Sequence, residues 1–332
     1  MATFSLDDVR KVCKARDAWW TVLLVDPIAV RLTLVVANRT SITPNQLTTV
    51  AFALGMGAAG CFALGSPGWL LVGALLYHVG FVVDCMDGKI ARLKRTGTLF
   101  GGWLDFMLDR VRDSVCALAL TAGQYARTGH AAYLYAGMAI LALDMFRYVN
   151  GPQIVKVRRS MRSAVNAARR RMAEPGVPAG AAGTAGAVEA EARDGRDGRE
   201  LDGEAEADAD AALDPMPDTD LHREFDSHFP WYRRIRRSLL RRRVRTHLVS
   251  GIEFQMAVFI IGPVTGAILP VTAVAGALLA FFELVIIYKF WLSTRAHGRI
   301  MAALGDGSPA LPAPPRSALP RHNLAPAVAD KD

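Results

Sequence analysis

Apolar residues in this chain gather into long blocks that are separated by short polar turns. The blocks lie at 47–65, 69–92, 98–125, 131–149, 248–269 and 271–292. A helix needs roughly 20 predominantly apolar residues to cross a bilayer, so each block is long enough to span one. The pattern therefore predicts an all-α, polytopic membrane protein with six transmembrane helices.

The N-terminal segment differs from these blocks. Residues 4 to 40 have an amphipathic, helical pattern in which Trp19 and Trp20 precede two short apolar runs. Arg31 interrupts the second run, which leaves it too short to span. Tryptophan and basic residues favour the headgroup level, so we expect a helix lying along the cytoplasmic interface. A packed soluble helix is the alternative.

Two further regions have a composition unlike that of the blocks. Residues 151–247 form an insert whose arginine-rich flanks surround a centre of Ala, Gly, Pro, Asp and Glu at 173–220. This centre lacks the large apolar residues that offset ordering entropy, so we expect it to be disordered. The basic flanks are expected to continue the neighbouring helices towards anionic headgroups. The tail at 294–332 is rich in Pro and Ala and is also expected to be disordered.

The chain is thereby divided into five parts. They are an interfacial segment at 1–42, four spans with the main motif at 43–150, the insert at 151–247, two spans at 248–293 and the tail at 294–332. Lysines and arginines cluster on one side of the predicted bundle, and the opposite turns contain only Arg127. The positive-inside rule therefore places both termini in the cytoplasm of a multi-pass plasma-membrane protein. Because these flanks explain the net charge of +8, no nucleic-acid partner is expected.

Four aspartates stand inside the second and third blocks. Asp84 and Asp87 are three residues apart, and Asp105 and Asp109 are four apart. Each pair therefore projects from one helix face, and two antiparallel neighbours can bring the pairs together. Four carboxylates in a low dielectric require cations, and all-oxygen ligation selects two ions of Mg²⁺ or Mn²⁺. An ion or proton carrier is the alternative use of such acids.

Small residues and a cation accompany the aspartates. Gly88, Ala91 and Gly101 leave room on the same faces for a nucleotide to approach the backbone. Arg92 can neutralise a phosphate. Small residues also serve ordinary helix packing, but packing does not account for four aspartates.

Together these residues complete the pattern DxxDGxxARx₈GxxxDxxxD. Its fixed positions are Asp84, Asp87, Gly88, Ala91, Arg92, Gly101, Asp105 and Asp109. The pattern, within residues 40 to 150, resembles the signature of the class I CDP-alcohol phosphatidyltransferase family. The resemblance implies six helices and a transferase that moves a substituted phosphate from a CDP-activated donor to an alcohol, with release of CMP, in phospholipid biosynthesis. Neither a carrier nor a membrane scaffold requires Gly and Arg at these spacings.

The resemblance also implies roles for the aspartates. Asp84, Asp87 and Asp105 would hold the divalent ions. Asp109 would be a further ligand, or the base that deprotonates the acceptor hydroxyl. A carboxylate is a weak base for an alcohol unless an ion or a desolvated site assists it.

Nucleotide contacts are implied on the same basis. Gly88, Ala91 and Gly101 would line the cytidine pocket, while Arg92 would hold the diphosphate. Asn45 and Thr48, at the start of the first span, resemble nucleotide contacts of the family. Ordinary helix capping is an equally good explanation of these two residues.

The acceptor is the least defined part of the site. Arg112 and Arg147, near the cytoplasmic ends of their spans, can bind an acceptor phosphate, as in family members that use inositol phosphate or glycerol phosphate. Snorkelling to headgroups is the alternative. CDP-diacylglycerol is the expected donor, and a soluble CDP-polyol with a polyol phosphate acceptor is the second possibility. Homodimers are usual in the resembling family, so we expect a homodimer surrounded by membrane lipids.

Overall fold

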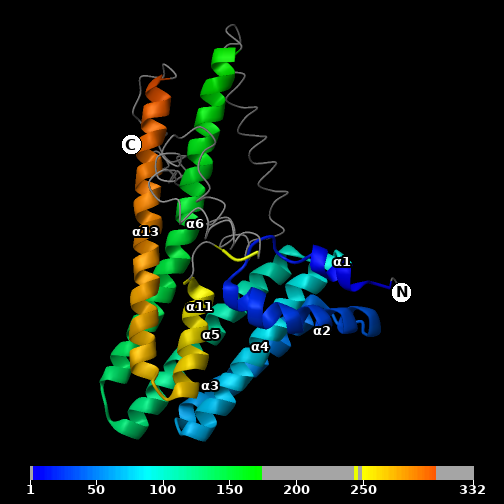
Figure 1. The fold of residues 1–332 in the computed structure, drawn as a ribbon, viewed down its shortest axis with the longest axis vertical. Helices are drawn as coiled ribbons and strands as arrows, with labels where there is room; N and C mark the ends of the chain where they lie inside the picture. The colour runs from blue at the N-terminus through cyan, green and yellow to red at the C-terminus, as the bar shows by residue number, and fades with distance from the viewer. Residues whose placement is uncertain (1–2, 174–242, 246–248, 304–332) are drawn as a thin grey trace, which may run out of the picture.

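The computed structural model describes residues 3–173, 243–245 and 249–303. Within these ranges every regular element is a helix, as Figure 1 shows, which confirms the predicted all-α fold. The expected disorder of the centre of the insert and of residues 304–332 lies outside the described residues.

The helices follow one another along the described chain with short connections. They are α1 (Leu6–Lys11), η1 (Thr21–Val25), α2 (Asp26–Arg39), α3 (Pro44–Leu64), α4 (Pro67–Lys94), α5 (Leu99–Thr128), α6 (Ala132–Ala173), α11 (Gly251–Met256), η2 (Ala257–Ile261), α12 (Gly262–Thr265) and α13 (Ile268–Ala303). The two η segments are π-helical and continue directly into α2 and α12. Each ends shortly before a proline, Pro27 or Pro263, which lacks the N–H that an unbroken α-helix would donate.

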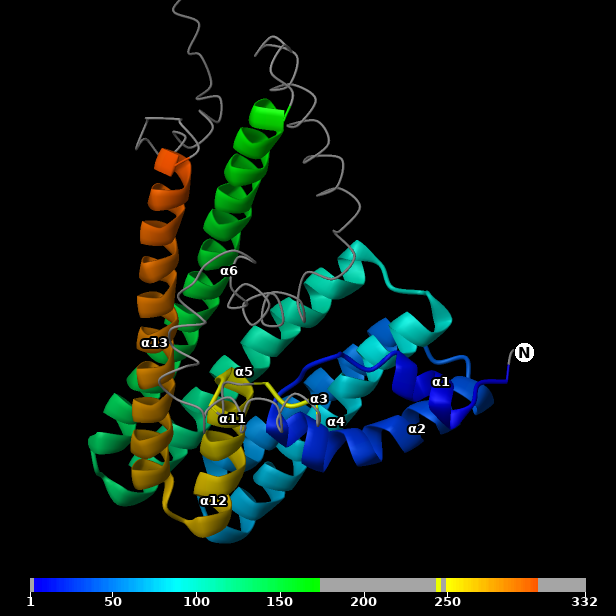
Figure 2. The same ribbon diagram turned by 45° about the horizontal axis from the view of Figure 1, so that its top comes forward.

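The helices α3, α4 and α5 form the part of the bundle that carries the motif. α3 packs along both α4 and α5, and Figure 2 shows the three lying alongside one another. Pro44 occupies the first turn of α3, and Thr43 caps it by accepting a hydrogen bond from the Gln46 amide. Tyr77 and Phe62 are fully buried here, and both rings pack against Phe259 of η2. This core fixes how α4 and α5 face each other.

Two helices are longer than their predicted spans. α6 has 42 residues and α13 has 36, and they lie side by side beyond the rest of the bundle (Figure 1). We expected the fourth span to end at 149, but α6 accommodates Pro152 inside the helix and continues through the first arginine-rich flank to Ala173. The expectation that this flank extends a helix is thus confirmed.

The predicted sixth span was wrong at both ends. The turn before α13 is made by Gly266, at φ 69°, and not by Pro270. Pro270 lies in the first turn of α13. Backbone N–H groups in a first turn have no acceptor within the helix, so a proline there removes no helical hydrogen bond. At its other end α13 continues to Ala303, because no proline follows before Pro309.

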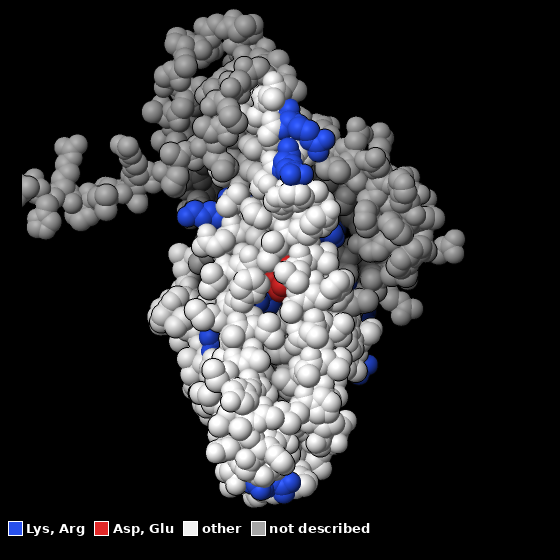
Figure 3. All heavy atoms as spheres, turned by 90° about the vertical axis from the view of Figure 1, so that its left-hand side faces the viewer, with Lys and Arg blue, Asp and Glu red and all other residues white. Residues whose placement is uncertain are grey.

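The outer surface of α6 and α13 is apolar. Figure 3 shows a broad face with few charged groups, between lysines and arginines in its upper part and others at its lower tip. Large exposed side chains on these two helices include Met138, Met145, Leu278, Phe281 and Leu284. Such a belt is suited to lipid, and the protein is an integral membrane protein.

Five helices in the described part of the chain are long and apolar enough to cross a membrane. They are Thr21–Arg39, Pro44–Leu64, Pro67–Lys94, Ala132–Ala168 and Ile268–Ala302. α5, which carries Asp105 and Asp109 together with Arg110, Arg112 and Asp113, is not among them, and Gly251–Thr265 is shorter. The count of six spans therefore stays a prediction. The expectation that this N-terminal segment is too short to span was wrong, because η1 and α2 together form the helix Thr21–Arg39. Its interfacial position stays a prediction, and Figure 1 shows α2 lying crosswise to α6 and α13.

The N-terminal segment packs over the same end of the bundle as the motif. α2 is tied to α4 by a buried ion pair in which Lys89 Nζ lies 2.9 Å from Asp26 Oδ1. Ahead of α2, Asp17 pairs with Val244 in a single β-bridge. The chain therefore brings the last residues of the insert next to the N-terminal segment, which in turn contacts α4.

Candidate active site

Three of the four motif aspartates meet between α4 and α5. Carboxylate oxygens of Asp84, Asp105 and Asp109 all lie within 4.8 Å of one another. The short loop after α4 turns the chain back, so residues four apart on α5 face Asp84 on the neighbouring helix. Three carboxylates at this separation fit a hard divalent cation such as Mg²⁺ or Mn²⁺. We call these three residues the aspartate cluster.

Asp87 takes a different position from the other three. It is buried, and its Oδ2 accepts a hydrogen bond of 2.6 Å from Thr48 Oγ1. Thr48, which we expected to touch a nucleotide, therefore ties α3 to the motif helix through Asp87. The expected role of Asp87 as an ion ligand stays a prediction.

Asn45 and Gly101 lie together where α3 and α5 begin. A Cβ added at Gly101 would stand 2.7 Å from Asn45 Oδ1, so the absent side chain leaves the space that Asn45 occupies. The caps of these helices are made by Thr43 and Thr98, which accept from the amides of Gln46 and Gly101. Capping therefore does not explain Asn45. The structure thus brings together two residues that we expected to contact a nucleotide.

The remaining expected nucleotide contacts lie on the last turns of α4. Gly88, Ala91 and Arg92 are partly exposed. The Arg92 guanidinium folds back over Gly88, where an added Cβ would lie 3.4 Å from Arg92 Nη1. Arg92 Nε also donates a hydrogen bond of 2.7 Å to the carbonyl of Val12. The N-terminal segment thus holds the arginine that we expected to bind the diphosphate.

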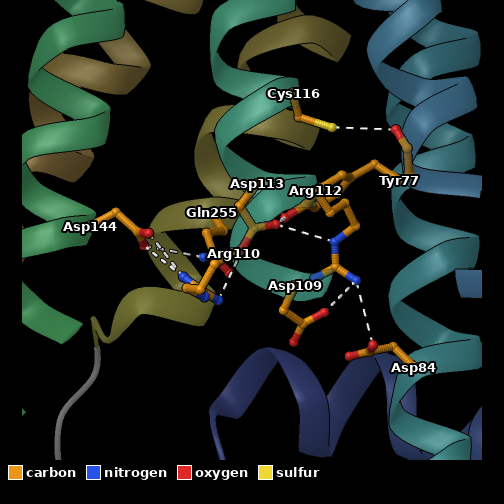
Figure 4. Close-up of polar contacts among 10 residues, drawn as sticks. Tyr77, Asp84, Asp109, Arg110, Arg112, Asp113, Cys116, Asp144 and Gln255 are labelled. Carbon is orange, nitrogen blue, oxygen red and sulfur yellow. Dashed lines mark hydrogen bonds and ion pairs between the residues drawn. The ribbon is translucent and has the colours of Figure 1, made fainter. Parts of the chain in front are cut away.

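The two arginines expected at the acceptor site lie apart from each other. Arg112 is only 3% exposed, and its Nη1 stands 2.9 Å from Asp109 Oδ1 and 3.5 Å from Asp84 Oδ1 (Figure 4). Arg147 packs 5.0 Å from the ring centre of Tyr148 and against Gly251, where an added Cβ would overlap its guanidinium. Both side chains are buried, which does not fit snorkelling to headgroups.

A second polar cluster lies beside the aspartates. We call it the Asp113 network. Its members are Tyr77, Arg110, Asp113, Asp144 and Gln255. Figure 4 shows these side chains, from α4, α5, α6 and α11, converging next to Asp109 and Arg112.

Part of this network had a signal in the sequence. Arg112 and Asp113 follow Asp109 by three and four residues, so they share its helix face, and Tyr77 precedes Asp84 by two helical turns. Gln255 is 142 positions away from Asp113, and no spacing rule connects them. That contact depends on the tertiary packing of α11.

Comparison with known proteins agrees with this geometry. The sequence model described as CDP-alcohol phosphatidyltransferase matches residues 41–168, which contain the aspartate cluster and Asp87. The archaetidylinositol phosphate synthase of Methanothermobacter thermautotrophicus is 33% identical over 90 residues, 27% of this chain and 45% of that protein. The phosphatidylinositol phosphate synthase of Corynebacterium glutamicum is 34% identical over 99 residues, 30% and 42% of the two chains.

A third relative matches over a shorter stretch. The bifunctional IPC transferase and DIPP synthase of Aquifex aeolicus is 42% identical over 78 residues, 24% of this chain and 17% of that protein. The chain thus spans less than half the length of each of these curated relatives. The segment that matches the CDP-alcohol phosphatidyltransferase model, residues 41–168, nevertheless contains every position of the motif.

Proposed function

We propose that this protein is a membrane phosphotransferase that moves a phosphatidyl-type group from a CDP-activated donor to an alcohol and releases CMP. The observation that carries the proposal is the aspartate cluster, whose carboxylate oxygens lie within 4.8 Å of one another inside the segment that matches the family. In the reaction, a bond forms between the acceptor oxygen and the phosphorus distal to cytidine, and the bond from that phosphorus to CMP breaks. Asp109 takes the proton of the acceptor hydroxyl.

The ion site is proposed on the aspartate cluster. Divalent ions held there, Mg²⁺ or Mn²⁺, would neutralise the charge of the diphosphate as CMP leaves. Asp87 lies on the same helix as Asp84, one turn further on, and is proposed to contribute to a second ion. Its hydrogen bond to Thr48 fixes the carboxylate in one orientation.

The nucleotide is proposed to bind where α3, α4 and α5 meet at the motif end. Asn45 and Gly101 would contact cytidine from the starts of α3 and α5, because the glycine keeps this corner open. Gly88 and Ala91 would let the nucleotide approach α4, with Arg92 on the diphosphate. Arg92 already lies over Gly88, on the surface that the nucleotide would contact.

The donor and acceptor are proposed from the chemistry and the relatives. CDP-diacylglycerol is the proposed donor, since the motif lies on helices that pack within a membrane protein. A polyol phosphate is the proposed acceptor, with Arg147 as its cation; two relatives are named as inositol phosphate lipid synthases. We further propose a homodimer in the plasma membrane, with both termini and the site on the cytoplasmic side.

The test is release of CMP by the purified full-length protein in lipid nanodiscs. CDP-diacylglycerol and CDP-inositol are each combined with inositol phosphate, glycerol phosphate and inositol, with Mg²⁺, Mn²⁺ or EDTA. We expect CMP release that requires both an ion and an acceptor, and that is greatest with CDP-diacylglycerol. Release of CMP only with CDP-inositol would show that the donor is a soluble CDP-polyol and not CDP-diacylglycerol. No release with any pair would overturn the proposal in favour of a carrier.

A further inference from the structure

Arg112 is a cation built into the aspartate cluster. Its Nη1 stands 2.9 Å from Asp109 Oδ1 and 3.5 Å from Asp84 Oδ1, so one nitrogen bridges carboxylates from α5 and α4. Carboxylates this close repel one another, and a guanidinium between them offsets part of that repulsion. The position of Arg112 therefore bears directly on how the cluster is arranged.

The side chain of Arg112 is held along its whole length. A Cβ added at Gly55 of α3 would overlap Cγ and Cδ of Arg112, so the arginine stem fills the space that the glycine leaves. Nε of Arg112 lies 3.2 Å from Asp113 Oδ1. The guanidinium is thus fixed at one edge by Asp113 and presents its other edge to Asp84 and Asp109 (Figure 4).

Asp113, in turn, is surrounded by donors from three helices. Its Oδ1 accepts from Tyr77 Oη at 2.9 Å as well as from Arg112. Its Oδ2 accepts from Gln255 Nε2 at 2.7 Å and lies 3.0 Å from Arg110 Nη2. A buried carboxylate with two donors on each oxygen has its hydrogen-bonding capacity filled and holds its neighbours in place. Asp113 is therefore suited to fix Arg112 and not to bind a ligand.

We propose that Asp113 is a positioning residue that acts through Arg112 to hold the Asp84 and Asp109 carboxylates in the arrangement that binds a divalent ion. The proposal rests on the ion site of the proposed function. It also gives Arg112 a role different from the acceptor contact expected from the sequence, because its charged end faces the aspartates. Outer contacts of this kind orient ligands, and their loss typically weakens metal binding about 10- to 100-fold.

The experiment measures Mn²⁺ binding to the purified full-length protein by the electron paramagnetic resonance signal of free Mn²⁺. Asp113→Asn keeps the size of the side chain but replaces one acceptor oxygen with a donor facing Arg112 or Arg110. We expect its Kd for Mn²⁺ to rise about tenfold. Tyr77→Phe removes one donor to Asp113, and we expect a rise of about fivefold, the effect of one hydrogen bond.

The matched control is Gln124→Met, which lies further along α5. Gln124 is buried and donates from Nε2 to the Gly65 carbonyl at 2.7 Å, so the variant removes a buried hydrogen bond without touching Asp113. We expect its Tm to fall as in Asp113→Asn, while its Kd for Mn²⁺ stays within about twofold. The Kd for Mn²⁺ separates positioning from loss of stability, since a purely structural role of Asp113 would change this Kd to the same extent in both variants.

The outcomes distinguish the two proposals. Failure of the unaltered protein to bind Mn²⁺ would overturn the ion site of the proposed function. Normal binding by the unaltered protein together with an unchanged Kd in Asp113→Asn would overturn the positioning role alone. If Asp113→Asn does not fold, Tyr77→Phe decides: weaker binding supports the role, and unchanged binding overturns it.

Discussion

Two groups of acids meet along α5, where Asp109 and Asp113 stand one helical turn apart, and their charges are balanced differently. In the Asp113 network, the Asp113 carboxylate accepts or pairs with four donors at 2.7 to 3.2 Å. In the aspartate cluster, three carboxylates converge within 4.8 Å, and Arg112 contributes one positive charge to two of them. The cluster therefore carries a larger excess of negative charge than the network, where Arg110 pairs with both Asp113 and Asp144.

This difference separates acids that are suited to bind an ion from acids that stabilise the fold. A carboxylate with both oxygens occupied cannot bind an added ligand without losing a partner. Converging carboxylates with excess charge are stable when a cation joins them. Burial follows the same division, because Asp113 is 4% exposed whereas all three acids of the aspartate cluster are partly exposed. The partners of each oxygen complete the distinction.

The largest expected effect is the loss of an acid from the aspartate cluster. Asp105→Asn should lower CMP release about 10³-fold, because it removes a charge on which the proposed ion and the leaving phosphate depend. Asp144→Asn removes the same charge from the Asp113 network, where Arg110 retains Asp113 as a partner, and should cost about tenfold. Steady-state CMP release by the two variants measures this ratio. Equal losses of CMP release in the two variants would contradict the distinction between the aspartate cluster and the Asp113 network.

A smaller effect is expected from crowding Arg112, which connects the aspartate cluster to the Asp113 network. Gly55→Ala places a methyl group against the stem of Arg112 and should displace its guanidinium, lowering both Mn²⁺ affinity and CMP release about tenfold. Gly60→Ala is the control on the same helix, since an added Cβ there meets nothing within 4 Å. Mn²⁺ titration and the CMP assay are applied to both. The connection through Arg112 would be contradicted by identical results for the two variants.

The smallest effect is expected at the edge of the motif. Thr48→Val keeps the shape of the side chain but removes the donor to Asp87, and should lower CMP release about fivefold, as expected for one hydrogen bond to a charged group. Thr48→Ser retains the hydroxyl and should stay within about twofold of the unaltered protein. A full loss in Thr48→Ser together with near-normal release by Thr48→Val would instead show that the threonine methyl matters more than its hydroxyl.

The sequence predicted the parts of the molecule that local spacing determines. The apolar blocks at 47–65, 69–92 and 98–125 correspond to α3, α4 and α5. Asp105 and Asp109 share a face because they are four residues apart on one helix. The family resemblance then gave the expected chemistry of these residues, and the comparisons bear out the family.

The remaining features depend on packing that spacing does not encode. Asp87 is held outside the aspartate cluster by its hydrogen bond from Thr48 on α3. One of the four donors around Asp113 comes from Gln255 on α11. Helix ends were also predicted less well. The block predicted to end at 149 continues as α6 to Ala173 with Pro152 inside it, and Pro270, which separates the last two predicted blocks, lies in the first turn of α13.

The most direct test of the account separates nucleotide binding from transfer. The full-length protein and its Asp109→Asn variant are compared for CMP binding in Mn²⁺ and for CMP release from CDP-diacylglycerol with inositol phosphate. We expect the variant to bind CMP with a Kd within about tenfold of the unaltered protein, because the other proposed ligands remain, and to release no measurable CMP. Near-normal release of CMP by Asp109→Asn would contradict the assignment of Asp109 as the base and of the aspartate cluster as the centre of the reaction.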